Sequence, residues 1–397
     1  MRTRVPFTRS VLASVFAACL AHAPAAGAQE AVSDILNFLL TNRSVVTDDF
    51  ERDRAALQAT SDAIQNALRL EVATLPLSSS SGAFTYRFNP ELGTSERVST
   101  NFGTFFVERA ATAGRGRASF GVTFRYSDYK TLDGFDLGDG TLVTTANQFA
   151  DEAQPFDREF LRLRLQTATT TAFANVGATD WLDLSVAVPV VMLRLEGERY
   201  DDFRGRQTLQ ASANAEVAGL ADMAVRAKVR LAGRRASGLA LGAELRLPTG
   251  SRDDLLGAGE VTYRGLVIAS VEGPGVALSA NAGYAGGGIA DQVDFGIGMS
   301  VAPAPRFTLS AEVFGRSLSG IGQLQPVTLP HPTIAGVQTL RLAADDSSQL
   351  TSAAVAGFKW NLAGNWLLNA NVLVPIGDRG LQADVAPAVS LEYAFGR

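Results

Sequence analysis

The sequence predicts an all-β protein, a transmembrane antiparallel up-and-down β-barrel, on three observations. Large apolar residues alternate with small or polar ones over many stretches, for example residues 120–126, 223–231 and 239–247. This period of two places alternate side chains on opposite faces of a strand. Short turns alternate with longer, more polar loops, as in barrels of the bacterial outer membrane. After the N-terminal segment, no run of about 20 apolar residues could form a membrane-spanning helix.

Residues 1–28 are expected to be a signal peptide. A basic start precedes an apolar core at residues 11–20, and small residues end at Ala28, where we expect cleavage. The basic residues of this start are Arg2, Arg4 and Arg9. A loose lipobox ending at Cys19, the only cysteine, makes lipidation an alternative. After cleavage, 32 basic residues (35 less 3) face 40 acidic ones, a balance that argues against a nucleic-acid partner.

We expect the barrel to occupy residues 81–397 and to contain fourteen strands, with twelve as the alternative because the first two are weak. An even number places both ends of the barrel on the periplasmic side. The predicted strands cover residues 83–88, 102–110, 117–127, 158–174, 181–195, 220–231, 238–247, 260–270, 275–285, 291–301, 307–316, 350–360, 366–376 and 383–396.

The tryptophans and the C-terminus support this prediction. Trp181, Trp360 and Trp366 border predicted short turns, where an aromatic girdle would meet the membrane interface. Packing in a soluble core is the alternative for these residues. Residues 391–397 alternate apolar and aromatic side chains and resemble the signal that the barrel assembly machinery reads. We therefore expect this machinery and outer-membrane lipid as partners, and the outer membrane as the location.

Residues 29–80 are predicted to form a short helical plug, joined to the barrel through a tether at residues 78–81. Side chains alone fill an eight-stranded barrel but not a wider one, so this segment is expected to close the lumen. A periplasmic extension that docks elsewhere is the alternative. The residues expected to act in the plug are the apolar Phe50, Leu57, Ile64 and Leu68 and the acidic Asp48, Asp49, Glu51 and Asp53.

Charged residues on the predicted strands are expected to face the lumen, and ten of them are basic and four acidic. A bare basic wall would favour anions, whereas an acidic plug would pair with it. The set is Arg125, Arg162, Arg164, Arg226, Lys228, Arg230, Glu244, Arg246, Arg264, Asp294, Glu312, Arg316, Lys359 and Glu392. The same alternation is expected to direct Leu163, Val225, Leu241 and Ile297 into lipid, and Gly242 and Gly298 into the lumen.

Four short segments of the sequence resemble segments of known outer-membrane protein families. They lie at residues 81–90, 102–110, 219–223 and 245–251. With them the mature chain resembles the outer-membrane transporters grouped with the MetA-pathway of phenol degradation and, more distantly, the long-chain fatty-acid transporters. This resemblance implies a fourteen-stranded barrel, an N-terminal plug and the passage of hydrophobic or aromatic compounds.

Enzymatic and metal chemistry find little support in the sequence. The only histidines are His22, in the signal, and His331, in a loop, and no G-x-S-x-G motif is present. A barrel lipase needs a serine with a histidine as base, so the sequence gives this class of enzyme little support and favours a surface role for His331. Three aspartates in a Gly-rich loop, Asp133, Asp136 and Asp139, suggest calcium, but apolar residues stand where an EF-hand loop needs oxygens. We expect no enzyme, no cofactor and no metal.

The sequence therefore predicts an outer-membrane transporter or channel for hydrophobic or aromatic small molecules, with its lumen closed by the plug. The alternative is a general diffusion porin or a structural barrel without specific cargo. Pro189 donates no hydrogen bond to the sheet and is expected to mark a kink. Such a kink could open a lateral exit for apolar cargo, or be a harmless bend.

Overall fold

The computed structural model describes residues 30–41, 50–73, 86–89, 94–97, 99, 101–233, 236–331, 333–345 and 347–395. The predicted signal peptide, the tether and the acidic Asp48 and Asp49 lie outside these residues. Among the residues that are described, no helix is both long and apolar enough to cross a membrane.

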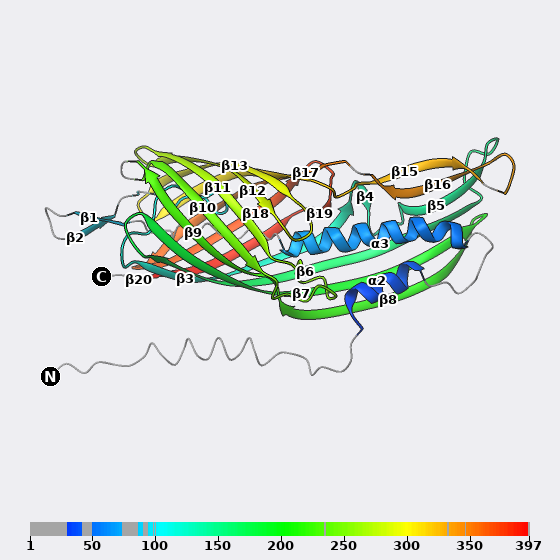
Figure 1. The fold of residues 1–397 in the computed structure, drawn as a ribbon, viewed down its shortest axis with the longest axis horizontal. Helices are drawn as coiled ribbons and strands as arrows, with labels where there is room; N and C mark the ends of the chain where they lie inside the picture. The colour runs from blue at the N-terminus through cyan, green and yellow to red at the C-terminus, as the bar shows by residue number, and fades with distance from the viewer. Residues whose placement is uncertain are drawn as a thin grey trace.

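In the described part of the chain, twelve antiparallel strands close the barrel, which is the smaller of the two predicted numbers. Figure 1 shows these strands around the barrel axis. Each strand pairs with its neighbour along the chain, and the last strand, β20, pairs with the first, β3. The wall consists of β3 (Ala118–Leu132), β6 (Asp157–Gly177), β7 (Leu182–Phe203), β9 (Met223–Ala232), β10 (Gly238–Leu247), β11 (Thr262–Glu272), β12 (Val276–Gly286), β13 (Gln292–Ala304), β14 (Phe307–Leu318), β17 (Gln349–Ala363), β18 (Trp366–Ile376) and β20 (Ala386–Phe395).

The first two predicted strands are not part of this wall. The chain forms a separate hairpin of β1 (Tyr86–Asn89) and β2 (Thr94–Arg97). Residues 101–113, which include the predicted strand 102–110, form no strand and are almost entirely buried. We call residues 101–113 the inner segment. Its apolar residues resemble those of a strand, but its backbone partners are side chains of the barrel wall, as described below.

One end of the barrel carries short turns and the other carries long connections. Trp181, Trp360 and Trp366 lie beside the β6–β7 and β17–β18 turns and are exposed at the turn end. At the loop end, β6 and β7 extend far beyond the other strands, with 21 and 22 residues. They continue into a half-wall in the order β15-β16-β5-β6-β7-β8. Its further strands are β5 (Leu142–Phe149), β8 (Arg206–Leu220), β15 (Leu324–Pro330) and β16 (Val337–Ala344). Two short strands, β4 (Phe135–Asp136) and β19 (Leu381–Ala383), pair with the upper part of β3.

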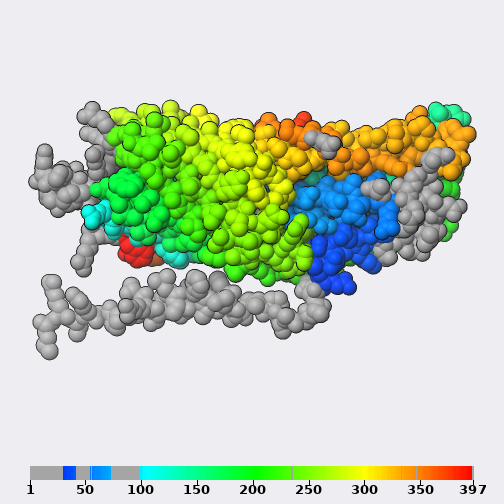
Figure 2. Space-filling view, viewed as in Figure 1, coloured from blue at the N-terminus to red at the C-terminus, as the bar shows by residue number. Residues whose placement is uncertain are grey.

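Two helices, α2 (Val32–Thr41) and α3 (Phe50–Ala73), cover the inner face of the half-wall. Figure 2 shows both in blue at the surface, beside the barrel and below the orange β15–β16 hairpin. Their apolar stripes bury Leu36, Leu39, Ile64 and Leu68 in a cluster with inward leucines of β6 and β7. The C-terminal end of α2 is held by Arg199, whose guanidinium donates to the carbonyl of Leu40. The helices therefore complete a hydrophobic core that lies above the barrel proper.

The outward side chains change character along the barrel. Below the half-wall, Val225, Leu241 and Ile297 lie on the outer face, as the alternation predicts. On the half-wall the register is the opposite of the prediction for β6. Leu163 is 4% exposed and contacts the helices, whereas Arg164 faces outward. The expectation for these two residues was wrong because the apolar face of β6 covers α2 and α3 there.

Candidate transport lumen

The inner segment crosses the lumen and is held by its backbone. The carboxylate of Glu312 on β14 accepts the N–H groups of three consecutive residues: Phe105, Phe106 at 2.9 Å and Val107 at 2.7 Å. Asp183 on β7 accepts the N–H of Ala113. A buried backbone N–H that lacks a partner costs free energy, so these carboxylates stabilise a segment that no sheet ladder can satisfy.

Two lysines bind the carbonyl groups of the same segment. Lys228 on β9 donates to the carbonyl of Ala111 at 2.9 Å, and Lys359 on β17 donates to that of Thr104 at 2.6 Å. Both ammonium groups are almost fully buried. Anionic groups thus hold the N–H groups of the inner segment, and cationic groups hold its carbonyl groups.

Small residues on β13 allow this close approach. A methyl group added at Gly298 would lie 2.6 Å from Cγ2 of Thr104, and one at Gly296 would lie 3.1 Å from Cγ2 of Val107. Gly103 has a φ of 72°, a left-handed conformation that glycine adopts without strain. The inward glycines of β13 are therefore part of the seat of the inner segment.

Above the inner segment, arginines and carboxylates from neighbouring strands form a charged belt. Glu244 on β10 pairs with Arg226 and with Arg246, each at 2.6 Å. Asp294 on β13 pairs with Arg264 at 2.7 Å. The belt lines the middle of the lumen, and each of its guanidinium groups has a carboxylate within ion-pair distance.

The belt also holds the end of helix α3. Glu71, in its last turn, lies 3.8 Å from the Nη2 of Arg125 on β3 and 3.6 Å from the Nη2 of Arg316 on β14. This single carboxylate therefore links the helix to two distant strands of the barrel wall.

A cavity of about 190 Å³, which we call the chamber, lies between the inner segment and the end of α3. Its floor includes Phe106 and Val107, and its upper wall reaches Arg379 and Gln382 in the β18–β20 connection. Charged side chains of the belt form one part of the lining. Apolar side chains form another part, among them Leu70, Leu266, Phe314, Leu373 and Pro375.

Most residues predicted to face the lumen do so in the structure. The inward set comprises Arg125, Arg226, Lys228, Arg230, Glu244, Arg246, Arg264, Asp294, Glu312, Arg316, Lys359 and Glu392. Arg162 and Arg164 differ and lie on the outer face of the half-wall. Arg162 stacks over the rings of Phe160 and Tyr200, and Arg164 lies 3.9 Å from Glu196 with a side chain that is 63% exposed.

The predicted plug residues have different surroundings from those expected. Leu57 and Ile64 are fully buried in α3, at the half-wall rather than within the barrel wall. Glu51 and Asp53 belong to α3, but their side chains lie outside the described ones, as does that of Phe50. The described carboxylates that reach the belt are Glu71 and Glu108, which sequence reasoning missed; Glu108 lies 3.9 Å from both Arg226 and Lys228. Glu71 had a signal, since it lies at helical spacing from Ile64 and Leu68.

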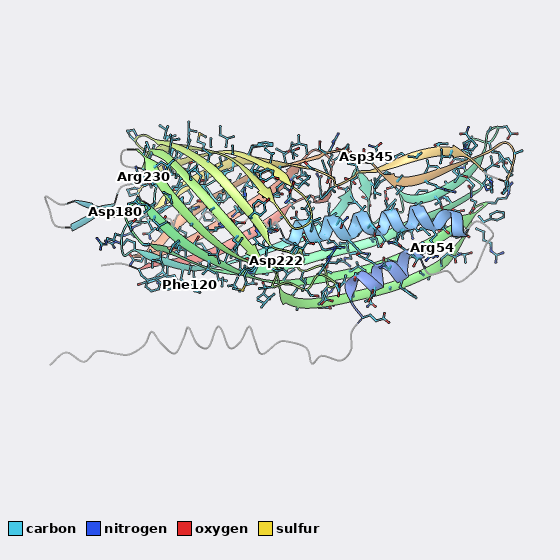
Figure 3. All side chains as sticks on the ribbon, in the orientation of Figure 1. Arg54, Phe120, Asp180, Asp222, Arg230 and Asp345 are labelled. Atoms are coloured by element: carbon cyan, nitrogen blue, oxygen red, sulfur yellow. The ribbon has the colours of Figure 1, made fainter. Side chains whose placement is uncertain are left out.

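Pro189 marks the place where the partner of β7 changes from β9 to β8. Its carbonyl accepts the N–H of Ala221 at 2.9 Å, and its side chain is buried on the inner face. Next to this junction lies Asp222, which Figure 3 labels. Its carboxylate accepts the N–H groups of Gly250 and Ala258. The bond to Gly250 joins residues 219–223 to residues 245–251, two of the segments that carry the family resemblance. The β8–β9 junction is therefore bridged rather than open.

The three loop aspartates do not converge on one point. Asp133 accepts hydrogen bonds from Leu324, Gln349 and Gly380, whereas Asp136 and Asp139 accept N–H groups of their own loop. Among the described residues, no group of three metal-binding side chains comes together. His331 is buried, and its Nδ1 accepts the N–H groups of Thr333 and Ile334 within a turn.

Comparisons with known proteins give structural neighbours at low similarity. No protein-family model and no curated protein sequence matches the chain. The transport unit of the autotransporter AIDA-I from Escherichia coli is 12% identical over 70% of this chain and 90% of that one, with a TM-score of 0.38. The toluene transporter TbuX of Ralstonia pickettii is 10% identical over 71% and 90%, with a TM-score of 0.30. The toluene transporter TodX of Pseudomonas putida is 10% identical over 81% and 98%, also with a TM-score of 0.30.

Proposed function

We propose that this protein is an outer-membrane transporter that admits hydrophobic or aromatic small molecules through a normally closed barrel. The outward apolar residues and the tryptophans at the turn end support insertion in a membrane. The charged outer face of β6 and β7 at the half-wall supports its placement in water on the cell exterior.

The observation that carries this proposal is the closure of the lumen at two levels. The inner segment crosses the barrel near the turn end, and the helices cover the loop end. One part of the lining of the chamber between them is apolar and suits a small apolar or aromatic molecule. An open diffusion pore would need neither the buried carboxylates nor the buried lysines that hold the inner segment.

A truncation series tests the closure. The mature chain is compared with a variant that lacks residues 29–76 and with one that lacks residues 29–114, by single-channel conductance in planar lipid bilayers. The first variant keeps the inner segment and is expected to stay closed, because the backbone clamps at Glu312 and Lys359 remain. The second variant loses both levels of closure and is expected to form a stable open pore.

The outcomes separate transporter from porin. An equally open pore in all three proteins would support the porin and refute the proposal. Closure of the variant that lacks residues 29–114 would show that wall side chains alone seal the barrel. The cargo is tested by the influx of radiolabelled toluene into cells with and without the full chain, and equal influx would contradict transport of aromatic compounds.

A further inference from the structure

The carboxylate of Glu71 forms ion pairs with Arg125 and Arg316 but lies beyond hydrogen-bond distance of the atoms that approach it. Distances of 3.8 and 3.6 Å allow Coulomb attraction but exceed those of a charge-assisted hydrogen bond. Arg125 is only 7% exposed, and its Nη2 is buried without a hydrogen-bond acceptor. Since a buried donor without an acceptor costs free energy, this position would gain from a carboxylate placed closer than that of Glu71.

The charge of the chamber also favours an anion. Its lining contains four arginines, Arg246, Arg264, Arg316 and Arg379, against three carboxylates, Glu71, Glu244 and Asp294. The excess is one positive charge (four less three), and it becomes two when Glu71 moves away. Guanidinium groups are the side chains that best match the geometry of a carboxylate.

The size and the apolar part of the chamber limit the rest of the ligand. A cavity of about 150 Å³ is large enough to bind benzene. The chamber of about 190 Å³ therefore fits one aromatic ring with a small substituent. Phe106 and Phe314, whose rings lie 5.6 Å apart in an edge-to-face arrangement, stand in its wall and offer contacts to such a ring.

We propose that the chamber binds a compact aromatic monocarboxylate, of which benzoate is the simplest member. Its carboxylate displaces that of Glu71, which lines the chamber, and so contacts Arg316 of the lining and Arg125, which lies outside the lining and is exposed to the ligand only when Glu71 moves away. The inference rests on the proposed function, because it names the class of cargo that occupies the same lumen. Displacement of Glu71 releases the end of α3 from the barrel wall. Binding of the cargo and opening of the loop end are thus one event.

Isothermal titration calorimetry of the full mature chain in detergent tests this proposal, with benzoate as the probe and benzamide as the uncharged isostere. Benzoate is expected to bind saturably and benzamide about tenfold more weakly or worse, because an amide forms no ion pair with the arginines. Glu71→Gln removes the competing charge and is expected to tighten the binding of benzoate. Arg125→Gln and Arg316→Gln are expected to weaken it by about tenfold or more.

Arg164→Gln is the matched control, since Arg164 lies on the outer face and should leave the binding of benzoate unchanged. The heat-dependent gel shift of folded barrels reports whether each variant folds. If either arginine variant fails to fold, Glu71→Gln still decides the question, because it keeps both guanidinium groups. Equal binding of benzoate and benzamide, or a Glu71→Gln variant that does not bind benzoate more tightly, overturns the inference. Toluene influx without any benzoate binding would also overturn it while leaving the proposed function intact.

Discussion

Buried charged residues in this lumen bind backbone as well as one another. Glu312 and Asp183 accept N–H groups of the inner segment, and Lys228 and Lys359 donate to its carbonyl groups. A segment inside a barrel cannot join the sheet ladder, so its polar backbone atoms need such partners. The alternation of the sequence places these four residues inward but does not show that they hold a segment of the same chain.

Glu312→Gln tests this interpretation at a single residue. Glutamine has one acceptor oxygen instead of two, so one or more N–H groups of the inner segment lose their partner, at a cost of about 1–3 kcal/mol. We expect transient openings in single-channel recordings that the wild-type chain does not show. Glu216→Gln, on the outer face of β8, is the control and should behave like the wild type. Identical closure in Glu312→Gln would mean that this carboxylate is dispensable for the seal.

At the scale of elements, Asp133 joins the connections at the loop end. It lies in the turn between β3 and β4 and has a φ of 49°. Its carboxylate accepts the N–H of Leu324, the first residue of β15, at 3.0 Å and that of Gly380, just before β19, at 2.8 Å. It also accepts the side-chain amide of Gln349 on β17 at 2.7 Å. One carboxylate therefore holds together segments that lie 191 to 247 residues away from it in the chain.

We call the three hydrogen bonds that Asp133 accepts the Asp133 clamp. They predict that the stability of the protein depends on pH. Burial raises the pKa of Asp133, although the N–H groups of Leu324 and Gly380 oppose the shift. The folded chain then binds the proton more tightly than the unfolded chain, so the contribution of this group to stability is greatest at low pH and is lost as the pH rises through its folded-state pKa. We expect the carboxyl carbon of Asp133 to titrate in NMR spectra with a midpoint above 3.8. The stability of the wild type relative to Asp133→Asn should fall as the pH rises from about 4 to about 7.

Asp345, in the connection between β16 and β17, provides the internal comparison. Hydrogen bonds from the N–H of Gln323 and from Ser347 lower the pKa of Asp345, so its NMR midpoint should lie below 3.8. If both aspartates titrate at the same pH, burial does not raise the pKa of Asp133, and the predicted dependence of stability on pH is wrong.

Sequence patterns predicted individual elements with unequal success. Strands in the second half of the chain, such as β10 and β12, agree with the predicted ranges within one or two residues. Their two faces have different surroundings, so large apolar residues alternate regularly with small or polar ones. Residues 102–110 contain the same mixture of apolar and small residues, yet form the inner segment. Local composition cannot distinguish them, since the difference lies in which distant side chains satisfy the backbone.

For the whole molecule, the outer surface divides into an apolar barrel and a polar half-wall. Leu241 on β10 and Leu209 on β8 are almost equally exposed, at 45% and 46%. They differ in their position along the barrel axis, since Leu241 lies on the barrel proper and Leu209 on the half-wall. If the membrane surrounds only the barrel, the same substitution should have very different effects at the two positions.

Leu241→Arg is expected to destabilise the barrel by about 2–4 kcal/mol if Leu241 is near the midplane of the bilayer. Leu209→Arg should change its stability by less than about 0.5 kcal/mol, because an arginine there remains in water. Unfolding in urea from lipid vesicles measures both effects. Equal losses at the two positions would contradict the boundary between barrel and half-wall, and no loss at either would contradict a membrane around the barrel.

The sequence by itself determined the barrel class, the inward direction of most lumen charges and the amphipathic helices before the wall. These properties depend on periodicity and composition, which act locally along the chain. Only the tertiary structure decided that residues 101–113 cross the lumen, that Glu71 is the carboxylate at Arg125 and Arg316, and that β6 turns Leu163 inward and Arg164 outward. Each of these outcomes depends on what each face of a strand contacts, which is lipid, water, a helix or another segment of the chain. The alternation of apolar and polar residues shows that the two faces of a strand differ, and only packing between distant segments decides which face points to the interior.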